Sequence, residues 1–158
     1  MTLLQSCEWL EHTWVSTTIR HSQWGFALIE MVHLVALALL GGALLVTGLR
    51  IFGVILRDQR PAVITRDLSC LILVSLLGLI LSGTLLFSEG PLRYYANAAF
   101  RMKLVLLALA LVSTATTHLL ANRYSSAQAI PAPVRMMTAL SLMLWLGVGI
   151  AGRVIGIL

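Results

Sequence analysis

Charged side chains are scarce in this sequence, at 11% of 158 residues, and aromatic ones make up only 7%. A soluble domain carries about 25% charged and about 45–50% apolar residues, whereas 59% of this chain is hydrophobic. The scarcity of charge excludes an ordinary soluble domain, and the hydrophobicity excludes a disordered chain. Two cysteines are too few for a disulfide scaffold. A small polytopic membrane protein is the class that remains.

Long apolar stretches are what the sequence has in quantity. A bilayer core about 30 Å thick takes roughly 20 apolar residues in a helix, and four runs reach that length. They are too long and continuous for β-barrel strands, which alternate over about 10 residues. We predict a single all-α domain, an up-down bundle of four transmembrane helices joined by short connections. The predicted spans are 24–47, 68–87, 102–120 and 134–158.

The first 23 residues differ from these runs. They lack the basic start and compact apolar core of a signal peptide, and they contain Glu8 and Glu11. Apolar residues recur there at roughly helical spacing opposite polar ones, which favours an amphipathic helix lying in the membrane interface. The residues on the apolar side are Trp9, Leu10, Trp14, Val15 and Thr18.

Basic residues predict the orientation by a narrow margin, since six lie on one side of the membrane and five on the other. The positive-inside rule places the larger set in the cytoplasm and both termini outside. The formal net charge of +5 fits contact with anionic lipid, and we expect no nucleic-acid partner. The larger set is Arg50, Arg57, Arg60, Arg66, Arg123 and Arg135.

Five ionisable residues fall inside the predicted spans, where their burial is costly and marks a functional site by default. Because a helix rises about 1.5 Å per residue, distance along the chain from the cytoplasmic arginines gives their depth. The estimated distance from the cytoplasmic face is roughly 25–30 Å for His33, Lys103 and Arg153, and only about 7–8 Å for His118. The fifth residue, Glu30, is three positions before His33.

These depths predict one polar pocket at the outer level of the bundle. Glu30 and His33 are spaced i, i+3 and share one helix face, which we expect to point into the bundle because lipid would not tolerate it. Lys103 and Arg153 join them from two further helices, with Met102 nearby. His118 stands alone near the inner level.

A histidine inside a membrane bundle is a natural axial ligand of haem iron. We therefore expect one or two haem b groups, with His33 as the first metal ligand. The two propionates of haem need basic partners, and Lys103, Arg153 and Arg20 are available at the right level. Glu30 would orient His33 or relay protons.

The second axial ligand stays open. His33 and His118 differ in depth by roughly 18 Å, which argues against one iron held between them, so His118 would hold a separate inner haem. The outer iron would take His21, His12, Met102 or a group from a second subunit.

Other interpretations of these residues remain. The same features fit a quinone headgroup, or Glu30 and His33 form a structural pair that locks helix packing. His118, Lys103 and Arg153 would then snorkel towards the membrane surfaces. Gly149, Gly152 and Gly156 form a small-residue stripe that favours close helix approach, and we expect a homo-oligomer through that face.

Two stretches of the sequence resemble known families over most of the chain. The chain is similar to small four-helix bacterial inner-membrane proteins of unknown function. One motif that carries this resemblance is Arg20-x-Ser22-x-Trp24 followed by Glu30-x-x-His33. The other is Phe100-Arg101-Met102-Lys103-Leu104-Val105-Leu106, in a stretch that ends near His118. More distantly, the chain resembles CopD-like copper-resistance proteins and HemJ-like protoporphyrinogen oxidases. The shared features are an embedded histidine in an early helix and a lysine at the start of a later helix.

The resemblance to miniature membrane cytochromes b implies haem at His33 and at His118, although the pair of histidines on one helix that such proteins often show is absent here. We therefore expect a b-type cytochrome of the bacterial inner membrane that exchanges electrons with quinone or a redox protein, in contact with the lipid bilayer. Whether it is a membrane oxidoreductase stays open. The alternatives are a non-haem CopD-like protein handling copper or a small solute, an accessory subunit of a larger complex, or a purely structural oligomer.

Overall fold

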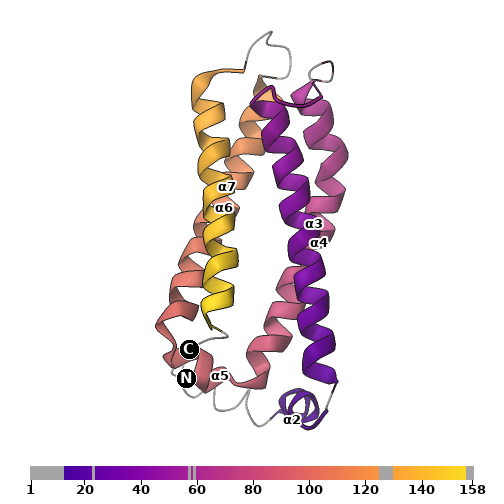
Figure 1. Cartoon of the computed structure of the whole chain (residues 1–158), viewed down its shortest axis with the longest axis vertical. Helices are drawn as coiled ribbons and strands as arrows, with labels where there is room; N and C mark the ends of the chain where they lie inside the picture. The colour runs from indigo at the N-terminus through magenta and orange to yellow at the C-terminus, as the bar shows by residue number, and fades with distance from the viewer. Residues whose placement is uncertain (1–12, 23, 57, 59, 125–129, 156–158) are drawn as a thin grey trace.

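The computed structural model describes residues 13–22, 24–56, 58, 60–124 and 130–155, and all regular secondary structure in these ranges is helical (Figure 1). Four long helices run side by side: α3 (Gly25–Ile51), α4 (Pro61–Glu89), α6 (Ala98–Arg123) and α7 (Ala132–Ile155). Each is long and apolar enough to cross a membrane. The predicted all-α, four-helix membrane fold is confirmed, and the chain is a multi-pass membrane protein.

Helix ends extend beyond the apolar runs. α4 begins at Pro61, seven residues before the predicted span, because proline is well suited to the first turn of a helix, where its missing N–H has no partner to lose. α3 ends in a Schellman motif: the N–H groups of Gly53 and Val54 donate to the carbonyls of Arg50 and Leu49, each at 2.9 Å. Gly53 has φ of +75°, a conformation that glycine adopts without strain.

Two short helices, α2 (Trp14–His21) and α5 (Pro91–Ala96), lie at the same end of the bundle (Figure 1). α2 packs against α3 and α4, where Ser16 and Ile19 are buried, while Trp14 is 80% exposed. The predicted interfacial segment 1–23 is therefore helical over its last part. Its residues 1–12, which include Trp9, Leu10 and His12, lie outside the described residues.

The bundle consists of two closely packed helix pairs. α3 packs along α4 and α6 along α7, while contacts of α3 with α7 and of α4 with α6 join the pairs. Small side chains such as Ala43 and Ala110 let the helices approach, and Trp145 fills the space between them. The buried core is Leu40, Ala43, Leu44, Ile72, Ala110, Trp145 and Val148. Large apolar side chains cover the outer surface, as contact with lipid requires.

Gly48 lies where α3 approaches α7. A Cβ atom on Gly48 would be 2.8 Å from Cδ1 of Leu142 and 3.4 Å from Cγ2 of Thr138, whereas one on Gly42 would meet nothing within 4 Å. We expect Gly48→Leu to destabilise the bundle by about 1–3 kcal/mol through overpacking. Gly42→Leu should leave the thermal midpoint in detergent unchanged or raise it, because glycine is unfavourable within a helix. Equal losses in both variants would contradict this packing.

Candidate functional site

His33 faces α4 and is held there by a hydrogen bond. Its Nδ1 atom lies 2.8 Å from Oγ of Ser82. Ser82 is buried, and its hydroxyl also donates to the carbonyl oxygen of Gly78 at 2.5 Å. A serine hydroxyl has one proton, so that proton is already committed to Gly78.

The tautomer of His33 follows from this arrangement. With the Ser82 proton placed on the carbonyl of Gly78, Nδ1 of His33 is assigned as the donor to Oγ. The neutral imidazole then has its lone pair on Nε2. A hydrogen bond from one ring nitrogen that leaves the other free is how proteins orient histidine for metal binding.

Gly83 of α4 packs against the imidazole ring of His33. A Cβ atom there would lie 3.4 Å from Cε1 and 3.8 Å from Nδ1 of His33. The neighbouring residues of α4 thus contribute a hydrogen-bond acceptor at Ser82 and, at Gly83, a backbone without a side chain against which the ring packs.

Lys103 reaches the same level from the start of α6. Its side chain is half-buried and extends over α7, where a Cβ on Gly152 would lie 3.4 Å from Nζ. Its ammonium group is also an electrostatic neighbour of His33. We call His33, Ser82, Gly83, Lys103 and Gly152 the His33 site; all four long helices contribute to it.

The expectation that Glu30 points into the bundle is wrong, because its side chain is exposed. The seam along which α3 packs runs through Ile29, His33, Ala36 and Leu40, which are buried or half-buried. Three residues advance a helix by about 300°, so Glu30 lies about 60° from His33 around the axis and falls outside this narrow seam.

The remaining outer candidates that the structure describes lie on the surface of the bundle. Arg153 and His21 are exposed, and Met102 is 61% exposed. His12 lies outside the described residues, as does the side chain of Arg20. Of the described residues predicted from the sequence, Lys103 is an electrostatic neighbour of His33.

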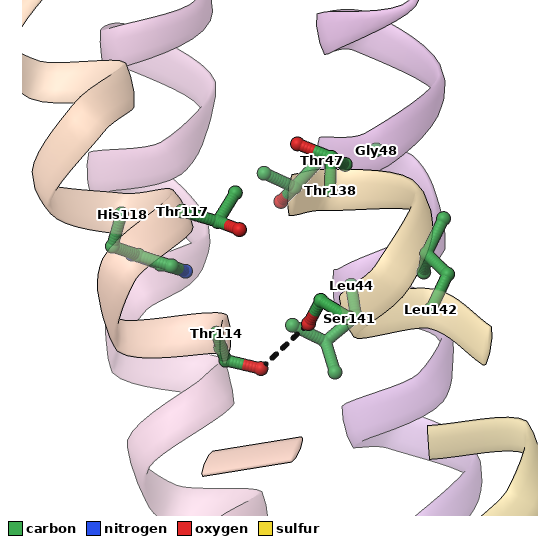
Figure 2. A pocket seen from close by; sticks show the side chains of 9 residues that line it. All are labelled: Leu44, Thr47, Gly48, Thr114, Thr117, His118, Thr138, Ser141 and Leu142. Atoms are coloured by element: carbon green, nitrogen blue, oxygen red, sulfur yellow. Dashed lines mark hydrogen bonds between the residues drawn. The ribbon is translucent and has the colours of Figure 1, made fainter. Parts of the chain in front are cut away.

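His118 occupies a different part of the bundle. It lines a small cavity with residues of α3 and α7, including Thr47 and Ser141 (Figure 2). Thr47 follows His33 by fourteen positions, so the two histidines are separated by about 21 Å along the bundle. This agrees with the separation of roughly 18 Å expected from the sequence, and the two imidazoles belong to separate sites.

Gly152 and Gly149 of the predicted interface stripe differ in their surroundings. Gly152 is covered by Lys103 of the same chain, whereas a Cβ on Gly149 would meet nothing within 4 Å. Gly156 lies outside the described residues. A homo-oligomer through this stripe stays a prediction.

Sequence reasoning missed Ser82 as a partner of His33, although a signal was present. Ser75 and Ser82 are seven residues apart in a charge-free run, and so lie on the same face of α4. Both are buried, and both donate to the carbonyl four residues earlier. Only Ser82 is level with His33. Within the described ranges, no three His, Cys, Asp or Glu side chains converge as a metal site.

A model of a protein family whose function is unknown matches residues 7–158. This agrees with the resemblance to membrane proteins of unknown function. Comparison with the curated proteins and with the solved structures gives no match. The match covers nearly the whole chain, including all four long helices and both histidine sites, and the protein therefore belongs to the family of unknown function DUF6644.

Proposed function

We propose that this protein is a small b-type cytochrome in which Nε2 of His33 binds the haem iron. The observation that carries the proposal is the hydrogen bond between Nδ1 of His33 and Oγ of Ser82. It fixes the ring and leaves the Nε2 lone pair free for an iron ligand bond.

The surroundings of His33 support haem as the ligand. Lys103 supplies a cation at the same level, and a charge-assisted hydrogen bond to a propionate would offset the cost of holding that ammonium within the membrane. The side chains of His33 and Lys103 pack directly on Gly83 and Gly152, so the backbones of α4 and α7 hold the imidazole and the ammonium group in place. Among the described residues, His33 is the histidine that would hold the haem at this level, and Lys103 is the cation that would bind a propionate.

Bound haem would supply one-electron transfer, and we propose quinone or a redox protein as the partner in a bacterial inner membrane. Both chain termini would then lie on the periplasmic side, as the arginine distribution predicts. In this arrangement His33 and Lys103 sit in the outer half of the bilayer, where an electron partner would exchange with the haem.

Absorption spectroscopy tests the proposal directly. Protein purified in mild detergent from haem-replete cells should show a Soret band that shifts on reduction with dithionite. Pyridine haemochrome analysis should give at least one haem per chain. A folded, monodisperse and colourless preparation would overturn the cytochrome proposal, and stoichiometric copper in that preparation would point to the CopD-like alternative.

A further inference from the structure

The second histidine site has a buried nitrogen with no partner. Nε2 of His118 is inaccessible to solvent and makes no hydrogen bond to the described protein atoms. It belongs to the cavity in Figure 2, between α3, α6 and α7, which has room for about one water molecule. We call this the His118 cavity. Its lining is Leu44, Thr47, Gly48, Thr114, Thr117, His118, Thr138, Ser141 and Leu142.

Three of the hydroxyl groups in the His118 cavity offer only lone pairs. Thr47 donates to the carbonyl of Ala43 at 2.9 Å, Thr117 to that of Ser113 at 2.9 Å, and Thr138 to that of Val134 at 2.8 Å. Each hydroxyl has one proton, so each is already committed to its own helix. The three oxygens therefore act only as acceptors towards the cavity.

The other two hydroxyl groups leave one proton available. Thr114 and Ser141 share a hydrogen bond of 2.9 Å, and Thr114 also accepts from Nε1 of Trp145 at 2.9 Å. One of their two protons lies between them, and the other has no acceptor among the described protein atoms. The cavity thus combines several acceptors, one spare hydroxyl proton and the imidazole.

We propose that the His118 cavity binds a single water molecule, hydrogen-bonded to Nε2–H of His118. The water accepts from the imidazole and donates its two protons to threonine hydroxyl oxygens. A buried water typically makes about three such bonds, and a buried Nε2–H without a partner would be destabilising. No carboxylate lines the cavity, so a bare cation there would have no balancing charge.

NMR of the whole chain in lipid nanodiscs, with ¹⁵N-labelled histidine, tests this site. At a pH where His118 is neutral, we expect the Nε2–H tautomer and a magnetisation-transfer signal between that proton and water; His118→Gln identifies the resonance. The Nδ1–H tautomer, or an Nε2–H without contact to water, would overturn the proposal. So would a His118 shift on exchanging Na⁺ for K⁺ at constant ionic strength, which would assign the cavity to a cation.

A pair of threonine variants separates hydration from general packing. Thr138→Val removes one of the three acceptors with little change of shape and should weaken the water contact of His118. Thr116 is on the same helix as His118 and also donates to its own backbone, at Val112, but it does not line the cavity. Thr116→Val should retain the contact. Equal effects of the two variants would overturn the proposal, and Thr47→Val replaces Thr138→Val if the latter fails to fold.

Discussion

Replacing His33 with alanine should abolish the Soret band of the purified protein. Among the described histidines at this level, His33 has a ring nitrogen, Nε2, that the hydrogen bond on the opposite ring atom leaves free. Loss of an outer-shell partner alone reduces metal affinity by about 10–100-fold, so loss of the ligand should lower the haem content by at least about tenfold. The measurement is the haem-to-protein ratio by pyridine haemochrome.

Met31→Ala is the matched control for this experiment. Met31 precedes His33 by two residues on α3, and its side chain is exposed on the outer surface, so its variant should keep the full haem content. His118→Ala should also keep it if there is one haem. A wild-type spectrum in His33→Ala would place the ligand elsewhere, and a halved haem content in His118→Ala would contradict the hydrated cavity.

Replacing Ser82 with alanine should weaken haem binding by about 10–100-fold without removing the iron ligand. The change leaves Nδ1–H of His33 without its acceptor, so the ring is no longer held in one tautomer and orientation. The measurement is haem titration of protein produced in haem-depleted cells, followed at the Soret maximum.

Ser75→Ala provides the control on the same helix. Ser75 is buried like Ser82 and donates to the carbonyl of Leu71, as Ser82 does to that of Gly78. The two variants therefore remove the same backbone interaction, and only Ser82→Ala removes the contact with His33. Equal haem affinities in Ser75→Ala and Ser82→Ala would show that the serine does not orient a ligand.

The apolar runs predict where the chain crosses the membrane, because the thickness of the bilayer sets the length of each helix. They do not predict how each helix is rotated about its axis. α3 is apolar on all sides, so no hydrophobic stripe indicates which face is buried. The inference about Glu30 failed for this reason, since only contacts with α4 and α7 decide that His33 faces inward and Glu30 does not.

The depths of polar residues were more predictable than their partners. The rise of a helix is constant, so His33, Lys103 and His118 could be assigned to levels by counting residues. Ser82 and the threonines of the His118 cavity escaped notice because a hydroxyl in a membrane helix commonly bonds to its own backbone and gives no charge signal. The role of Ser82 becomes clear only from its second hydrogen bond, to His33, and that of the threonines only from the unpartnered Nε2 of His118 beside them.

The pairing of α3 with α4 and of α6 with α7 has a consequence for biogenesis. Each pair is a hairpin of consecutive helices, and a hairpin can enter the bilayer as one unit before it docks against another. His33 and Ser82 both belong to the first hairpin, so the hydrogen bond that orients the imidazole needs neither α6 nor α7. Docking of the second hairpin then delivers the ammonium group. The chain order thus separates the orientation of the imidazole from the arrival of its charged neighbour.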